Sequence, residues 1–181
     1  MKKVVMLAAV ISLLCAAPAM AKEGFYLGAY YPNESLSGDA GTNVSSGGGW
    51  GLRAGMGMNR YFAVEAHYST TKHDVSGGGS FDLKSYAADA KINFPLTTLD
   101  SAQIMSLEPY LMAGYAHYEA DRGTTLKSDG FQWGFGIELY LFQELSVEAG
   151  WTKSTISFDT SPTKTDGDVK TVELGLIYHF I

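Results

Sequence analysis

Apolar side chains occupy every second position over several stretches of this chain, and this period of two is what most constrains its fold. From Phe131 to Leu141 each odd position is aromatic or aliphatic, while the even positions hold Gln, Gly, Glu and Tyr. The same alternation runs through 50–58, 62–68 and 172–180. Because successive side chains of a strand point to opposite faces, these stretches predict β-strands that bury one face.

Four weaker segments, at 25–31, 86–94, 110–118 and 145–151, bring the predicted strands to eight. Each strand is close to the length of about 9–11 residues that a tilted membrane strand needs. The parity of the segment 110–118 is ambiguous, because two of its tyrosines, at positions 110 and 115, fall on opposite faces.

The connections between these strands alternate in length. Short ones lie at 59–61 and 143–144, whereas longer, polar and Gly-rich ones cover 33–47, 72–80, 119–129 and 159–168. Outer-membrane barrels have short turns on the periplasmic side and longer loops outside, so this alternation predicts four outer loops. The connection at 95–107 is a misfit, because it is long although it falls on the side of the short turns.

Two features of the apolar face predict that it meets lipid rather than water. None of the residues assigned to it is charged in any of the eight strands, whereas a soluble barrel would carry Lys and Glu there. Its aromatic residues also gather near both ends of the strands, as in the belts at the two membrane interfaces. The predicted aromatic girdle consists of Tyr31, Trp50, Tyr68, Trp133 and Trp151 near the long connections, and of Phe62, Phe94, Tyr178 and Phe180 near the short ones.

The last strand completes the fold prediction. An alternating strand that reaches Phe180 can pair with the first strand and so remove both sheet edges, whose unpaired backbone would be costly in lipid. We therefore predict an all-β fold, namely a closed antiparallel eight-stranded transmembrane up-and-down β-barrel.

The N-terminal residues predict export. Two lysines precede an apolar run that is too short to span a bilayer as a helix, and Ala19-Met20-Ala21 offers a signal peptidase site. We expect residues 1–21 to be a cleaved signal peptide, with cleavage between Ala21 and Lys22, and residues 22–181 to form the barrel domain. The exported part holds 11 basic and 19 acidic residues, a net charge of −8 (11 − 19), which argues against a nucleic-acid partner.

The opposite face of the strands is rich in glycine and carries isolated charges, which the narrow lumen of an eight-stranded barrel would enclose. They are Arg53, Glu65, Asp89, Lys91, Glu138, Glu148 and Glu173. The first short turn sets Arg53 beside Glu65 or His67, depending on its register, and the second sets Glu138 beside Glu148. Because like charges on neighbouring strands repel each other, this acidic pair needs a cation.

These charges lead to a hypothesis about the lumen. We propose a lumen charge network, which plugs the barrel and in which two bases bridge four acids: Arg53, Lys91, Glu65, Asp89, Glu138 and Glu148. Two alternatives stay open at this stage. The same residues would serve as structural groups around ordered water, or they would line a gated path for protons or ions.

Several segments carry a family resemblance. GFQWGFGIELYLFQELSVEAGWTKSTI and VKTVELGLIYHF resemble the last three strands of the small OmpX/OmpA-type outer-membrane β-barrels, and GWGLRAGMGMNRYFAVEAHY is similar to an early hairpin of that superfamily. The resemblance spans most of residues 24–181. It implies a Gram-negative outer-membrane protein that contacts lipopolysaccharide and other outer-membrane lipid, the barrel-assembly machinery, and host or matrix surface molecules through its outer loops.

Signs of catalytic chemistry are few. His67-Tyr68-Ser69 has the His-x-Ser spacing of outer-membrane lipid A deacylases, but His67 and Ser69 fall on the lumen face. His73-Asp74 with Ser76 falls in a predicted outer loop and would suit an acyltransferase, although a solvated polar loop explains it more simply. The four histidines show no metal-ligand spacing. We therefore predict a protein that is not an enzyme, with no cofactor and no metal.

Two functions from different classes remain. The first is a structural or surface-interaction scaffold that supports adhesion, serum resistance or envelope integrity through its outer loops. The alternative is a narrow, porin-like channel for ions or small solutes. A plugged lumen favours the scaffold, because eight strands leave little room for a wide pore.

Overall fold

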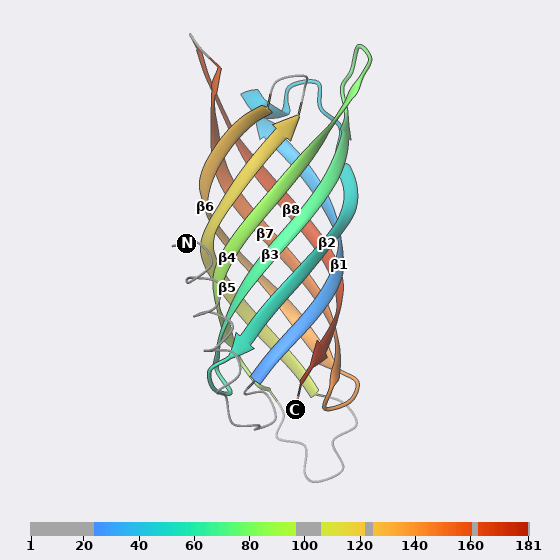
Figure 1. The fold of residues 1–181 in the computed structure, drawn as a ribbon, viewed down its shortest axis with the longest axis vertical. Helices are drawn as coiled ribbons and strands as arrows, with labels where there is room; N and C mark the ends of the chain where they lie inside the picture. The colour runs from blue at the N-terminus through green and yellow to red at the C-terminus, as the bar shows by residue number, and fades with distance from the viewer. Residues whose placement is uncertain (1–23, 97–105, 122–124, 161–162, 181) are drawn as a thin grey trace, which may run out of the picture.

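The computed structural model describes residues 24–96, 106–121, 125–160 and 163–180, which form eight antiparallel strands closed into a barrel (Figure 1). Every strand pairs with its neighbours along the chain, and the last strand pairs with the first, as predicted. The predicted signal peptide lies outside the described residues. The strands are β1 (Gly24–Gly38), β2 (Gly47–Gly57), β3 (Phe62–Asp74), β4 (Ser80–Asn93), β5 (Ser106–Asp121), β6 (Thr125–Tyr140), β7 (Leu145–Thr160) and β8 (Thr163–His179), with a short 3-10 helix, η1 (Asp39–Gly41), after β1.

The strand register fixes the stagger of the barrel. From Glu138 on β6, the paired residues lead once around the sheet through Glu148, Gly175, Tyr30, Gly51, Ser69, Ser85 and Tyr118. They return to β6 at Ser128, ten residues from the start (138 − 128). A stagger of this size tilts the strands by roughly 40° from the barrel axis. All the residues on this path lie on the lumen side of the sheet.

Two of the connections at one end are tight turns, as predicted. In the β2–β3 turn the Asn59 side chain accepts hydrogen bonds from the backbone N–H groups of Tyr61 (2.8 Å) and Phe62 (3.0 Å). This turn sets Arg53 directly opposite His67, which resolves the register that the sequence left open. Most of the connection at 95–107 lies outside the described residues, apart from its first two residues and the start of β5.

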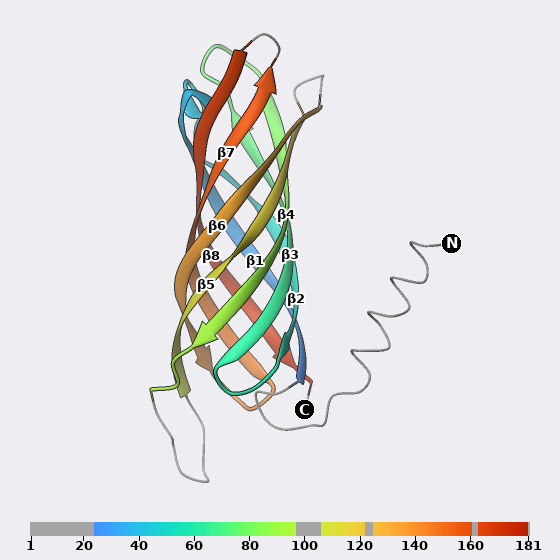
Figure 2. The same ribbon diagram turned by 90° about the vertical axis from the view of Figure 1, so that its left-hand side faces the viewer.

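The four connections at the other end, which we call the outer end, are shorter than predicted. Described strand residues make up eight of the eleven positions of the predicted loop 119–129 and eight of the ten positions of 159–168, whereas connections remain at 39–46 and 75–79. The outer end is at the top of Figure 2, where the β7–β8 hairpin is drawn in orange and red. In β4, for example, Phe81 and Leu83 point inward and are 5% and 1% exposed, while Asp82 points outward. These stretches resemble loops in the sequence because their outward side chains are polar.

The outer surface at mid-height carries the apolar face of the strands. Leu52, Phe135 and Leu174 are about half exposed there, and the nine residues assigned to the girdle lie on the same outer face. The ambiguous parity in β5 is resolved, because Tyr110 is 2% exposed in the lumen and Tyr115 is 68% exposed outside. Among the described residues, no helix has the length and apolar character to cross a membrane.

Polarity inverts along the barrel axis. Below the outer part of the girdle the lumen is polar and the outside is apolar. Beyond it the outside is charged, and the lumen holds an apolar cluster beside a few buried polar side chains of β1 and β3. We call this apolar cluster the outer core; it consists of Phe81, Leu83, Ala116, Tyr118, Ala120, Ile156 and Val169. The outer ends of the strands are therefore built like a soluble barrel, with their hydrophobic side chains inside.

Candidate functional site

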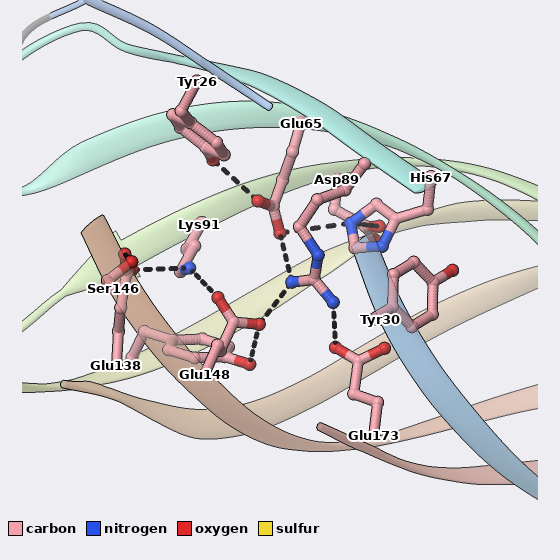
Figure 3. A network of polar contacts seen from close by, with 12 residues as sticks. Tyr26, Tyr30, Glu65, His67, Asp89, Lys91, Glu138, Ser146, Glu148 and Glu173 are labelled. Atoms are coloured by element: carbon pink, nitrogen blue, oxygen red, sulfur yellow. Dashed lines mark hydrogen bonds and ion pairs between the residues drawn. The ribbon is translucent and has the colours of Figure 1, made fainter. Parts of the chain in front are cut away.

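The lumen charge network lies in the half of the barrel that the girdle surrounds, and side chains such as Glu65, Lys91 and Glu148 come together in it from different strands (Figure 3). Arg53 is at the centre of its contacts. Its guanidinium is buried and hydrogen-bonds to Glu148 on β7 and to Glu173 on β8, the latter at 2.7 Å between Nη2 and Oε1. Glu65 on β3 lies 4.0 Å from Nη1. One base thus holds carboxylates from three other strands, across the lumen as well as along the sheet.

Lys91 is the second base of the network, and it lies between two carboxylates that the strand register places opposite each other. Its Nζ is 2.7 Å from Glu148 and 3.2 Å from Glu138. The ammonium also lies 4.0 Å from the centre of the Tyr110 ring, whose hydroxyl donates to Glu148 at 2.7 Å. The repulsion expected between the two glutamates is therefore offset by a shared cation.

Asp89 departs from the hypothesis. Its carboxylate accepts hydrogen bonds from Gln132 Nε2, at 3.1 and 3.3 Å, and lies 3.4 Å from His67 Nε2. It is therefore held by an amide and an imidazole rather than by Arg53 or Lys91. The structure brings the other five predicted residues into one connected cluster, and Asp89 joins it only through His67, which also lies 3.1 Å from Glu65.

Sequence reasoning missed several further members of this network. Tyr26 donates a hydrogen bond of 2.6 Å to Glu65, and Ser146 donates one of 2.6 Å to Glu138, whose same oxygen lies 3.0 Å from His179. Their inward parity was readable from the sequence. Their partners were not, because alternation does not show how far a side chain reaches: Ser146 lies on the strand next to that of Glu138, whereas the contacts of Tyr26 and His179 each skip a strand.

Glycines on the lumen face make room for the large side chains of the network. A Cβ atom at Gly51 would overlap the Tyr30 ring, and one at Gly55 would overlap the Tyr26 ring. The Tyr30 ring in turn lies against the Arg53 guanidinium, with 4.6 Å between its centre and Cζ. The glycine-rich face thus reflects close packing inside a narrow barrel, as expected where glycine interrupts a strand.

A second polar group lies farther toward the outer end. Glu34 is buried and accepts a hydrogen bond of 2.6 Å from Thr71, whose hydroxyl lies 3.1 Å from His73 Nε2. His73 Nδ1 lies 3.0 Å from the carbonyl oxygen of Ser45, and its ring stacks on Phe81. The placement of His73 in a solvated outer loop is therefore wrong: it is a fully buried residue of β3.

A small cavity separates this group from the charge network. Its volume is about 20 Å³, enough for one or two water molecules. Its lining includes Glu34, Ser69, Ser85, Gln132 and Glu173. A polar cavity of this size can hold ordered water.

The residues that suggested lipid chemistry do not form a site on the lipid face. Ser69 Oγ hydrogen-bonds with Ser85 Oγ (2.7 Å), whereas His67 contacts Glu65 and Asp89, and both residues point into the lumen. In the described part of the chain, no group of three His, Cys, Asp or Glu side chains is arranged to hold a metal ion.

Residues 6–180 match the family described as the outer membrane protein beta-barrel domain. The chain belongs to this family. As a member of the outer membrane protein beta-barrel domain family, it is located in the outer membrane of a Gram-negative bacterium. Its eight-stranded barrel is of the type that the resemblance to OmpX-like barrels predicted.

Solved structures of other outer-membrane β-barrels share this fold. Neisserial surface protein A has 18% identity and a TM-score of 0.65, with 86% of this chain and 97% of that chain covered. Ail, the attachment invasion locus protein of Yersinia pestis, has 18% identity and a TM-score of 0.56, with 87% and 99% covered. OprG of Pseudomonas aeruginosa has 16% identity and a TM-score of 0.55, with 88% and 97% covered. No curated protein matches the chain significantly.

Proposed function

We propose that this barrel is a structural scaffold that does not conduct and that raises a rigid surface above the outer membrane for interactions with other molecules. The observation that carries the proposal is a lumen filled at two levels. The charge network occupies the level that the girdle surrounds, and the outer core occupies the level beyond it. Such a surface would serve adhesion, serum resistance or envelope integrity.

The energetics of the network support a closed lumen. An ion that crosses it must displace Lys91 or Arg53 from buried carboxylates, and separating one partner of a buried ion pair costs about 3–5 kcal/mol. It would then meet the outer core, where Leu83 and Ile156 are each 1% exposed and offer no hydrogen bond to a dehydrated ion. An ion that moves along the barrel axis would have to pass both obstacles, one after the other.

The charge of the outer end bears on the kind of partner. Ail has been solved in complex with the heparin analogue sucrose octasulfate, so a barrel of this fold can bind a sulfated sugar. On the present chain, the described outer strand ends carry more outward carboxylates than lysines; the carboxylates are Asp74, Asp82, Glu119, Asp121, Asp129, Asp166 and Asp168. We therefore expect a partner with a neutral or basic surface rather than a polyanion.

The outer surface also differs from the one that the sequence suggested. The connections are shorter than predicted, so the proposed surface consists mainly of strand faces, such as the outward side of β5 around Glu119 and of β8 around Asp168. A partner would meet a preformed surface and would not need to order long loops, which lowers the entropic cost of binding.

Planar-bilayer recording of the purified, folded protein tests the closed lumen against the alternative of a narrow porin-like channel. We expect no stable current steps from the unmodified barrel. The Arg53→Ala variant, which empties the centre of the network, should conduct more often than the Lys72→Ala variant, which removes a charge from the outside. Frequent, long-lived channels in the unmodified protein would contradict the proposal and favour the channel.

A further inference from the structure

A short segment between η1 and β2 covers the outer core at the outer end of the barrel (light blue, at the top of Figure 1). It comprises residues 42–46, which we call the cover segment. Val44 forms an antiparallel bridge with Val75, just after β3, and both side chains pack against the outer core. Two backbone hydrogen bonds flank this bridge, from the Ser45 N–H to the carbonyl oxygen of Asp74 (3.0 Å) and from the Ser76 N–H to that of Asn43 (2.8 Å).

The His73 side chain anchors the cover segment from inside the barrel. Its ring is fully buried and stacks on Phe81, and its Nδ1 lies 3.0 Å from the carbonyl oxygen of Ser45. Because a carbonyl oxygen can accept a hydrogen bond but not donate one, Nδ1 must carry a hydrogen. A Cβ atom at Gly47 would lie 2.8 Å from the same ring, so the backbone of β2 also packs closely against it.

The state of the other ring nitrogen follows from Thr71. Its Oγ1 lies 2.6 Å from Glu34 Oε2 and 3.1 Å from His73 Nε2, and a hydroxyl has a single hydrogen to donate. If Thr71 donates to Glu34, Nε2 must carry a hydrogen as well, and the ring is a cation. If Thr71 donates to Nε2 instead, Glu34 must be protonated and donate to Thr71. Donation to the Leu83 carbonyl oxygen, at 3.4 Å, would require both protons.

The Glu34–His73 pair therefore holds at least one proton more than a neutral imidazole beside a carboxylate. With one additional proton the pair carries no net charge, whichever of the two groups binds it. Glu34 is 2% exposed and His73 is fully buried, and Nε2 and Oε2 are 3.9 Å apart. Loss of the proton would leave a net negative charge among buried side chains next to the outer core, which is costly.

The other ionisable groups around the pair lie farther away or point outward. Within the described part of the chain, Glu34 is the acid that lies within 4.0 Å of the His73 ring nitrogens. The outward neighbours on the same hairpin are Lys72 and Asp74 on β3 and Asp82 on β4. Farther into the lumen, the small cavity that Glu34 borders is also lined by Glu173, His67, Tyr30 and Tyr118.

We propose that Glu34 and His73 form a proton-dependent latch, which holds the cover segment on the outer core while the pair keeps its additional proton and releases the segment when that proton is lost. In the released state both side chains reach water, where a histidine is half protonated near pH 6.5 and a glutamate ionises near pH 4.3. Above about pH 6.5 the released state therefore binds one proton fewer than the latched state. The release equilibrium then shifts toward the open form as the pH rises.

The latch would regulate the outer surface of the barrel. In the latched state the cover segment keeps water away from Phe81 and Leu83 and contributes to a rigid outer end. In the released state Val44 leaves the outer core and exposes apolar side chains at the tip of the barrel. This inference does not rest on the proposed scaffold role, because the latch lies beyond the charge network and acts whether or not the lumen conducts.

The test is backbone amide hydrogen exchange, followed by NMR on the folded full-length protein in phosphatidylcholine nanodiscs. The readout is the protection factor of the Ser45 and Ser76 N–H groups, that is, the exchange rate of an unstructured peptide at the same pH divided by the measured rate. It should fall about tenfold between pH 7 and pH 8, since release is linked to the loss of one proton. The Val75 N–H, which donates to the Gly79 carbonyl oxygen within the β3–β4 hairpin, should keep its protection.

The deciding variant is Glu34→Gln. A glutamine amide can donate to Thr71 while Thr71 donates to a neutral His73 ring, so the latched state no longer needs the additional proton. The protection factors of Ser45 and Ser76 should then be the same at pH 7 and pH 8. The matched control is Asp82→Asn, which removes one negative charge from the outward face of β4 and should keep the tenfold fall.

Three results would overturn the latch. Protection that does not change with pH in the unmodified protein would exclude the additional proton, and an unchanged tenfold fall in Glu34→Gln would assign the dependence to another group. Loss of the fall in Asp82→Asn would indicate a general effect of charge. A mobility shift between unboiled and boiled gel samples verifies that each variant is folded. An independent measurement needs no variant: NMR shifts of the His73 ring nitrogens and the Glu34 carboxyl carbon at pH 7.5 should show the additional proton, and a neutral ring beside an ionised carboxylate would contradict the proposal.

Discussion

Replacing Lys91 with methionine would remove the cation between two carboxylates that the register places opposite each other. Lys91 is 1% exposed and lies 2.7 Å from Glu148 and 3.2 Å from Glu138. Methionine fills a similar volume, so the main effect is electrostatic. Removing one partner of a buried ionic cluster costs about 3–5 kcal/mol.

The remaining contacts decide where in this range the loss falls. Glu148 keeps Arg53 and the Tyr110 hydroxyl, and Glu138 keeps Ser146, His179 and the Tyr140 hydroxyl. We therefore expect the lower end, a loss of about 3 kcal/mol in the free energy of unfolding. The second substitution Glu138→Gln removes the uncompensated charge, and the Lys91→Met/Glu138→Gln variant should regain about half of the loss.

The assay is urea unfolding of the barrel in lipid vesicles, followed by tryptophan fluorescence and by the mobility of unboiled samples on gels. With a slope of about 2 kcal/mol per molar urea, a loss of 3 kcal/mol lowers the midpoint by about 1.5 M. Lys84→Met, on the outward face of the same strand, is the control and should leave the midpoint nearly unchanged. A loss below about 1 kcal/mol for Lys91→Met, or no recovery in the double variant, would refute the view that Lys91 neutralises the acidic pair.

Three further changes test other parts of the molecule. Leu83→Asp places an unpaired charge in the outer core at a local cost of about 3–5 kcal/mol. We expect added protease to cleave the outer strand ends, while the gel shift of the folded barrel persists. A barrel that stays intact and resists protease would contradict the assignment of Leu83 to the outer core. Gly51→Val overlaps the Tyr30 ring and should cost about 1–3 kcal/mol in urea unfolding, and adding Tyr30→Ala should recover part of it. His73→Ala removes the contact with the Ser45 carbonyl and should speed proteolysis near Ser45, with a stability loss of about 1–3 kcal/mol; unchanged cleavage would show that this contact does not hold the segment.

The strands within the membrane were predictable from the sequence because a single physical rule governs them. Charged side chains are unfavourable in lipid, so apolar residues such as Phe135 and Leu174 mark the outward positions of a strand. The remaining positions of the same strand then point into the lumen. The tight turns then fix the neighbouring register, so that turn position and alternation together are enough to place Glu138 opposite Glu148.

The contacts across the lumen were not predictable in the same way. Arg53 contacts Glu173 although the two residues are 120 positions apart in the sequence. They meet because β2 and β8 lie on either side of β1 and because the ten-residue stagger of the barrel places the two side chains at similar heights along its axis. Neither the stagger nor the side-chain reach can be read from alternation. Asp89 was likewise assigned to the two bases, although its partner Gln132 lies two strands away in the same row of the sheet, on the other side of Gly114.

The outer strand ends show why alternation needs a known solvent before it can be interpreted. Along β4 the parity never changes: Leu83 and Lys91 both point inward, while Asp82 and Ile92 both point outward. Only the surroundings change, from lipid outside a polar lumen to water outside an apolar one. If lipid is assumed throughout, the inverted part is mistaken for a loop. Because that part is a packed barrel, its outward side chains are held in fixed positions by the outer core, and substitutions in the core should alter binding at the outer surface as strongly as substitutions in the surface itself.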